Sequence, residues 1–125
     1  MKAKNPKPST LLKKSLALLG PKGEKWIQDE EEISPGDTDQ NDEKTYPEGA
    51  FCSIGAIHHV NTNNEDKAAA YLAFAIRFYT NDFNREESWT DTSIITNAND
   101  DVRTNFTKVK RWFTKAIQMA KKNGD

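Results

Sequence analysis

The feature that most constrains this fold is the segment 68–76, Ala-Ala-Ala-Tyr-Leu-Ala-Phe-Ala-Ile, which would be apolar on nearly every side of a helix. Glu65 and Asp66 precede it and place negative charge where the dipole of a helix N-terminus favours it. A helix that is apolar all round needs other elements to cover it. We therefore expect a central helix over about 65–80, surrounded by other helices.

The N-terminal part of the chain carries a second helix pattern. Five leucines between residues 9 and 19 form an apolar stripe, with lysines outside it. Ser9 or Thr10 is expected to cap this helix, and Gly20-Pro21 is a typical helix end.

Three further segments are expected to be helical. Residues 50–60, AFCSIGAIHHV, indicate a short helix that enters the core, in which Gly55 permits a close neighbour. Residues 88–98 indicate a helix capped by Thr90 or the aspartate after it. Thr104 is expected to cap a final helix to about residue 122, with an apolar stripe on one face and lysines on the opposite one.

Together these patterns predict an all-α fold, a small helical bundle of four or five helices forming a single domain over residues 1–125. The chain is shorter than the length at which proteins divide into domains, and its 10% aromatic content argues against disorder. Residues 1–8 are expected to be a flexible basic arm. Residues 29–48 are expected to be a long acidic loop, and a short extended segment is expected near Trp26.

The net charge of −1 conceals an uneven distribution along the chain. Residues 1–25 hold seven lysines and one acid, whereas residues 26–101 hold four bases and seventeen acids. Residues 102–125 again hold seven bases and one acid. One interpretation is that the basic terminal helices pack beside the acidic middle and the fields cancel; the other is that both basic ends share a face that meets an anionic partner.

The single cysteine, Cys52, excludes an internal disulfide and favours a reducing compartment. No secretory signal is visible, and the longest nearly apolar stretch, 68–79, is too short to span a bilayer. We therefore expect a soluble cytoplasmic protein without a membrane partner.

The acidic loop matches part of a calcium-loop template. Oxygen-bearing residues occupy template positions 1, 3, 5, 7, 9 and 12: Asp37, Asp39, Asn41, Glu43, Thr45 and Glu48. Position 6, which needs glycine for a sharp turn, is Asp42, and flanking prolines remove the helix–loop–helix frame. We expect a plain solvated loop, with calcium binding as the alternative.

Cys52 is a candidate nucleophile. It is expected near a helix N-terminus, where the dipole lowers a thiol pKa, but His58 and His59 would lie about 9–10 Å away along the helix axis. We expect Cys52 to be a buried small hydrophobe. The alternative is a small polar pocket formed by Cys52, Asn99, Asp100 and Arg103. In that pocket Cys52, Asp100 and Arg103 would be the catalytic candidates. One cysteine and two histidines cannot supply a four-ligand zinc site, and no cofactor is expected.

Three blocks of sequence carry a resemblance when taken in order. They are the leucine helix with Gly23 and Trp26-Ile27-Gln28, the box Phe51–Ile57, and Asn99-Asp100 followed by Arg103-Thr104 and Val109. Their order and spacing resemble a family of small uncharacterised bacterial and phage proteins of unknown function. The chain departs from that pattern at Ala98, where the family has tryptophan, and in its longer acidic loop.

The resemblance implies a helical fold and a bacterial or phage source, and it brings no established activity. The charge distribution and the absence of an assembled catalytic set lead us to expect a non-enzymatic interaction protein, and the resemblance suggests that a phage encodes it. Its partner would be a host or phage protein that meets the acidic loop or the basic terminal helices. The alternatives are a small Cys-dependent hydrolase or ligand-binding protein using Cys52 and the segment Asn99–Arg103, and a nucleic-acid-binding accessory protein using the terminal helices. The sequence leaves the oligomeric state open.

Overall fold

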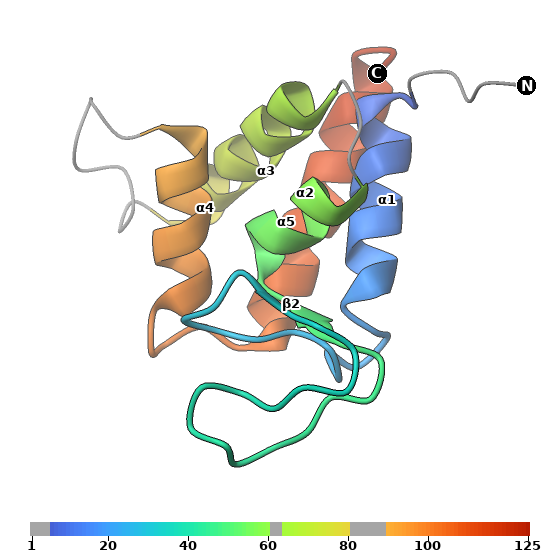
Figure 1. The fold of residues 1–125 in the computed structure, drawn as a ribbon. Helices are drawn as coiled ribbons and strands as arrows, with labels where there is room; N and C mark the ends of the chain where they lie inside the picture. The colour runs from blue at the N-terminus through green and yellow to red at the C-terminus, as the bar shows by residue number, and fades with distance from the viewer. Residues whose placement is uncertain (1–5, 61–63, 81–89) are drawn as a thin grey trace, which may run out of the picture.

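The computed structural model describes residues 6–60, 64–80 and 90–125, and this part of the chain forms five helices and one two-stranded sheet (Figure 1). The predicted all-α bundle is confirmed. The elements, in chain order, are α1 (Pro8–Leu18), β1 (Glu32–Ile33), β2 (Ala50–Phe51), α2 (Ser53–Val60), α3 (Glu65–Tyr79), α4 (Asp91–Asp100) and α5 (Phe106–Lys122).

The C-terminal helix α5 packs against α1 on one side and α3 on the other, so the two basic ends of the chain lie side by side (Figure 1). The short helix α2 contacts α1, α3 and α4. The backbone of Ser9 at the start of α1 donates to the carbonyl of Asp125 at 3.0 Å, which ties the C-terminus to the first turn of α1.

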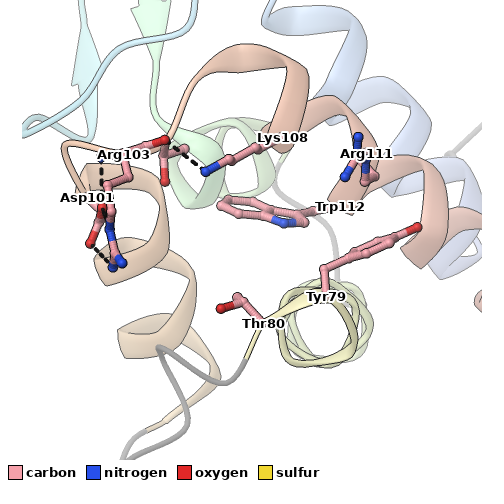
Figure 2. A pocket seen from close by; sticks show the side chains of 8 residues that line it. Tyr79, Thr80, Asp101, Arg103, Lys108, Arg111 and Trp112 are labelled. Atoms are coloured by element: carbon pink, nitrogen blue, oxygen red, sulfur yellow. Dashed lines mark hydrogen bonds and ion pairs between the residues drawn. The ribbon is translucent and has the colours of Figure 1, made fainter.

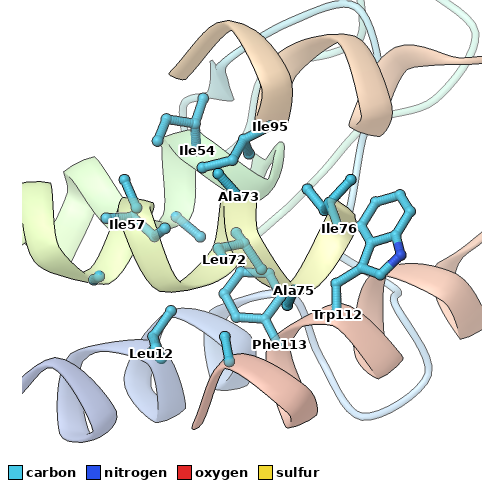
Figure 3. Close-up of a cluster of buried hydrophobic side chains, with 14 of the residues drawn as sticks. Leu12, Ile54, Ile57, Leu72, Ala73, Ala75, Ile76, Ile95, Trp112 and Phe113 are labelled. Atoms are coloured by element: carbon cyan, nitrogen blue, oxygen red, sulfur yellow. The ribbon is translucent and has the colours of Figure 1, made fainter. Parts of the chain in front are cut away.

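The core lies where the five helices meet, and each of them contributes to it (Figure 3). Among the described residues, Phe113 of α5 is the largest side chain that is fully buried. Around it lie apolar side chains from the other helices, among them Leu12, Ile57, Leu72, Ile76 and Ile95. Burying each such side chain contributes about 1.5–3 kcal/mol, so the core fixes the arrangement of all five helices.

The expectation that α3 is covered on every side is wrong. Its Phe74, Phe78 and Tyr79 are 55%, 59% and 43% exposed. Helix α3 packs against α1, α2, α4 and α5 through the side that carries Leu72, Ile76 and four of its five alanines, and its outer side faces solvent. Local apolar content therefore overstated how much of this helix the bundle covers.

Two of the expected helix caps are also wrong. Helix α1 begins at Pro8, with Lys7 at the N-cap position and no capping side chain, so the predicted flexible arm over 1–8 ends inside a helix. Residues 1–5 of that arm lie outside the described residues. The N-cap of α5 is Asn105, whose side chain accepts from the backbone N–H of Lys108 at 3.0 Å, whereas Thr104 donates to the carbonyl of Ala98.

The segment expected to be one helix over 50–60 divides at Cys52. Ala50 and Phe51 form β2, which pairs antiparallel with β1 in the register Glu32–Phe51 and Ile33–Ala50. Phe51 also forms a parallel bridge with Trp26, which is the short extended segment predicted there. The backbone N–H and carbonyl of Phe51 bond to Lys25 and Ile27, and the backbone N–H of Cys52 bonds to Glu31, so α2 begins only at Ser53.

The close neighbour predicted at Gly55 is confirmed. A β-carbon on this residue would lie 2.0 Å from the carbonyl oxygen of Glu31. That same carbonyl accepts from the backbone N–H of Cys52 at 3.0 Å. The first turn of α2 therefore rests directly on the backbone of the acidic loop.

Helix α4 begins later and ends later than predicted. Thr90 is the N-cap and accepts from the backbone N–H of Ser93, as expected, but the first helical residue is Asp91. The helix continues to Asp100, past its predicted end at residue 98, because the side chain of Asn99 is held inside the core. Residues 88 and 89 of the predicted helix lie outside the described residues.

The acidic loop over 29–48 is more structured than a plain solvated loop. It contains β1, a bridge between Thr38 and Thr45, and the buried Ile33, which packs with Ile27 and Ala50 in a small second core. Most of its other residues are exposed. No helix in the described ranges has the length and apolar character needed to cross a bilayer.

Candidate functional site

A fully buried asparagine, Asn99 near the C-terminus of α4, joins three separate parts of the chain. Its Oδ1 accepts from Trp26 Nε1 at 2.7 Å, from Ser53 Oγ at 2.7 Å and from the Ser53 backbone N–H at 3.0 Å. Its Nδ2 donates to the carbonyl of Ile27 at 3.0 Å and to Asp100 Oδ1 at 2.9 Å. We call these contacts the Asn99 network, and they satisfy every donor and acceptor of the amide.

The segment after Trp26 strengthens this junction at the end of α4. Gln28 Nε2 donates to the carbonyls of Asn99 and Asp101 at 2.9 and 3.0 Å, which satisfies acceptors that a helix C-terminus leaves free. The backbone N–H of Asp29 donates to Asp100 Oδ1 at 2.9 Å. The blocks Trp26-Ile27-Gln28, Cys52-Ser53 and Asn99-Asp100 thus meet in one place, and their shared role is to hold the fold together.

Cys52 belongs to this junction but has the properties of a structural residue. It precedes α2, as predicted, and its Sγ accepts from the backbone N–H of Gly55 at 3.3 Å. The side chain is 4% exposed. Burial raises the pKa of the thiol to about 11, and the charge of Asp100 adds to the rise, while the hydrogen bond from Gly55 opposes it. Desolvation therefore outweighs any lowering of the thiol pKa at the start of α2, and the burial of Cys52 agrees with the expectation of a buried small hydrophobe.

The other two catalytic candidates, Asp100 and Arg103, lie in different parts of the structure. Asp100 lies in the Asn99 network beside Cys52. Arg103 is held by Asp101, with Nε to Oδ1 and Nη2 to Oδ2 both at 2.9 Å. This pairing lowers the pKa of Asp101 to about 2. Arg103 thus lines a different pocket, and the four-residue polar pocket considered from the sequence does not form.

Two of the calcium-loop candidates, Asp39 and Glu48, use their side-chain oxygens in other contacts. Asp39 Oδ1 accepts from the backbone N–H groups of Asn41 and Glu43 at 3.2 and 2.8 Å, which shapes the turn of the loop. The carboxylate of Glu48 forms an ion pair with Lys25. Asp37 contributes backbone hydrogen bonds to Tyr46 and Ser34. Within the described residues, no group of three acidic, histidine or cysteine side chains is placed to hold a metal ion.

The adjacent histidines at the end of α2 face the start of the acidic loop. His58 Nδ1 lies 3.1 Å from Glu31 Oε2, and His59 Nδ1 lies 3.8 Å from Glu32 Oε2. The ring of His59 packs on Phe51 at a centroid distance of 4.7 Å. These contacts give the histidines a role in holding the loop against α2.

One pocket with a cationic lining lies between the end of α3 and the start of α5. Its volume is about 250 Å³. Figure 2 shows Lys108, Arg111 and Trp112 of α5 facing Tyr79 and Thr80, with the Arg103–Asp101 pair at the other side of the opening. Lys108 Nζ donates to the carbonyl of Arg103 at 3.0 Å, which fixes the ammonium group beside the pocket. We call this the α3/α5 pocket.

A second hollow, which we call the α1/α5 groove, lies between the two terminal helices and has a volume of about 370 Å³. Lys13 and Lys110 lie among its lining residues. The other lining residues are apolar or belong to the turn after α1. They are Leu16, Ala17, Phe106 and Ile117, with Gly20 and Pro21 from the turn. Its chemistry is that of an apolar hollow flanked by ammonium groups.

The positive charge around this groove is not neutralised within the described part of the chain. Neither α1 nor α5 contains an acidic residue. No lysine or arginine on these two helices forms an ion pair with a described acid. The pKa of Lys13 lies below its ordinary value, because its amine is within hydrogen-bonding reach of Lys121, a contact that needs one of the two amines to be neutral, and because the two charges repel. The packing of α1 against α5 places the two basic ends of the chain side by side, while an anionic partner for them stays a prediction.

Sequence reasoning missed both hollows and two members of the Asn99 network, Trp26 and Ser53. The partners in these contacts are 46 to 73 residues apart in the chain, so no local pattern marks them. The exposed aromatic residues of α3 were missed because they were assigned to the core. The charge distribution was the one signal that pointed to the face formed by α1 and α5.

The comparisons with known proteins identify the family but no activity. No curated protein and no solved structure matches the chain well enough to be counted as similar. The model of a family of unknown function, DUF6197, matches residues 3–119, which is most of the chain. The three blocks that meet at Asn99 all fall within that match. The chain therefore belongs to the DUF6197 family, a family of unknown function.

Proposed function

We propose that this chain is a non-enzymatic interaction protein whose α1/α5 groove binds an acidic, amphipathic segment of a protein partner. The observation that carries the proposal is the apolar groove flanked by lysines on two helices that contain no acid. The resemblance to small bacterial and phage proteins supports a phage gene, and a bacterial cytoplasm as the place to seek the partner.

The groove suits this kind of partner because its floor and its rim differ in chemistry. An apolar side chain of the partner would fill the space over Leu16, Phe106 and Ile117. Carboxylates one helical turn away on the partner would reach Lys13 and Lys110. Such contacts would also relieve the repulsion between Lys13 and Lys121.

The acidic loop is a weaker candidate for the partner surface, because part of its charge is already matched within the chain. Glu48 forms an ion pair with Lys25, and the carboxylate of Glu31 lies within hydrogen-bonding distance of the His58 ring. The basic side chains of α1 and α5 have no such partners among the described acids. The unmatched charge therefore favours the groove.

The Cys-dependent alternative has less support. A cysteine nucleophile acts as a thiolate and must be reached by its substrate. The Cys52 side chain is 4% exposed and its pKa is raised to about 11. A thiol with these properties is almost entirely protonated and covered at neutral pH.

The test is the affinity of the full chain for a synthetic helical peptide with leucines on one face and glutamates on the other, measured by fluorescence anisotropy. The double variant Lys13→Glu/Lys110→Glu should weaken binding by on the order of tenfold, since each reversal replaces an attraction by a repulsion. The matched control is Lys14→Glu/Lys115→Glu, which changes the same charges on the same two helices outside the groove.

Two outcomes would count against the proposal. One is an equal loss of binding in the two double variants. That result would show that the peptide is attracted by the overall charge of the protein and not by the groove. The other is unchanged binding of a peptide in which the leucines are replaced by serine, because the groove then contributes nothing.

A further inference from the structure

A strip of alternating aromatic and cationic side chains runs along the outer surface of α3 and α5. Phe78 and Tyr79 of α3 are 59% and 43% exposed, and Phe74 lies one turn earlier on the same helix. Lys115 and Arg111 of α5 lie beside these rings. We call this the α3/α5 strip, and at its Tyr79 and Arg111 end it continues into the α3/α5 pocket.

The cations of the strip sit over the aromatic rings and hold them in place. Lys115 Nζ lies 4.2 Å from the centre of the Phe78 ring, and Arg111 Cζ lies 5.6 Å from the centre of the Tyr79 ring. The two rings meet edge to face at 5.1 Å. Since each ring remains about half exposed, the strip presents ordered aromatic surface with positive charge next to it.

The pocket at the end of the strip adds a place for a negatively charged group. Three cationic side chains, Arg103, Lys108 and Arg111, and one acid, Asp101, line it. The two hydrogen bonds from Arg103 to Asp101 fix the guanidinium before any ligand binds. Side chains that are already ordered lose less freedom when a ligand arrives.

We propose that the α3/α5 strip binds single-stranded nucleic acid, with bases against Phe78 and Tyr79 and a phosphate at the pocket lined by Lys108 and Arg111. Exposed rings interleaved with cations are the surface that single strands use, because every base has a face that stacks and every nucleotide a phosphate. A duplex keeps its base faces covered and could use only the charges. An acidic protein segment would use the charges but gain nothing specific from the flat ring faces.

This proposal is independent of the one for the α1/α5 groove. The strip and the pocket use α3 and the side of α5 that carries Lys108, Arg111 and Lys115. The groove uses α1 and the side of α5 that carries Phe106, Lys110 and Ile117. Either surface can therefore fail its test without affecting the other.

The experiment measures binding of the full chain to a fluorescent oligothymidylate by anisotropy at several salt concentrations. If about three phosphates are neutralised, a plot of log affinity against log salt should have a slope of about −2. The variant Arg111→Gln should make the slope shallower by about 0.7. The control Lys14→Gln removes an exposed charge from α1 and should leave the slope unchanged.

The aromatic contribution is tested at Phe78, which is exposed enough to be changed without disturbing the core. Phe78→Leu keeps an apolar side chain but removes the ring, and it should weaken binding by about tenfold. Phe78→Trp keeps a ring and should restore binding. Circular dichroism of each variant should match that of the unchanged chain.

The proposal is overturned by any of three results. The first is that a duplex of the same length binds as tightly as the single strand. The second is that Phe78→Leu binds as well as the unchanged chain. The third is that polyglutamate at equal charge displaces the oligonucleotide as well as an unlabelled single strand does. Tighter binding of the single strand with sensitivity to both Phe78 and Arg111 supports it.

Discussion

Replacing Asn99 by alanine should remove a large part of the stability of the protein. The truncation leaves Trp26 Nε1, both donors of Ser53 and the carbonyl of Ile27 without their partner, at a site with no exposed surface. A buried polar group that loses its partner costs about 1–3 kcal/mol. Four such groups, with water entering the space to satisfy some of them, give a loss of about 3–5 kcal/mol. That is a large fraction of the 5–15 kcal/mol typical of a domain.

The assay is equilibrium unfolding in urea, followed by circular dichroism and by tryptophan fluorescence. The fluorescence is informative because Trp26 donates directly to Asn99. The matched control is Asn97→Ala, two residues earlier on α4, where the exposed amide donates to the carbonyl of Ser93 at 2.8 Å. The control should change the free energy of unfolding by about 0.5 kcal/mol or less. Similar losses for Asn97→Ala and Asn99→Ala, or a loss below about 1 kcal/mol at Asn99, would refute the reasoning.

Three other predictions concern single residues of the fold. Gly55→Ala should lower the free energy of unfolding by more than about 2 kcal/mol in the same urea assay, since its β-carbon would meet the backbone carbonyl of Glu31 at 2.0 Å; unchanged stability would contradict that contact. Asn105→Ala should cost about 1 kcal/mol as the loss of an N-cap, and unchanged stability of this variant would show that the side chain of Asn105 does not cap α5. The Cys52 thiol should ionise at about pH 11 by absorbance at 240 nm and react with iodoacetamide chiefly on unfolding. The pKa of the folded thiol lies above the ordinary value of 9.0, so the contribution of Cys52 to stability should be complete below pH 9 and should be lost as the pH rises towards 11. The variant Cys52→Ser should not show this loss.

The helices could be predicted because each follows from a local pattern. The stripe of α5 and the alanine-rich segment of α3 place apolar residues at helical spacing, and Thr90 precedes α4 as a capping residue should. The predicted element boundaries are wrong where contacts with residues distant in the chain determine the local conformation. Ala50 and Phe51 are extended because β1 and residues 25–27 pair with them, and α4 runs on to Asp100 because Asn99 is held by Trp26 and Ser53.

The candidate site was predictable only in part. The separation of charge along the chain pointed to a basic face, and the packing of α1 against α5 forms it. The apolar floor of the groove could not be foreseen, because Leu16 and Ile117 come from opposite ends of the chain. The strip was hidden for a different reason. Phe78 has the hydropathy of a core residue, and composition does not tell which apolar side chains a small bundle leaves exposed.

The measurement that tests the central claim most directly is a titration of ¹⁵N-labelled protein with the acidic amphipathic peptide, followed by amide chemical shifts. The claim that the α1/α5 groove is the protein-binding surface predicts that the changes cluster at residues 13–21 of α1 and the following turn and at residues 106–117 of α5. Changes confined to the acidic loop over 29–48, or the same small changes over the whole chain, would contradict it.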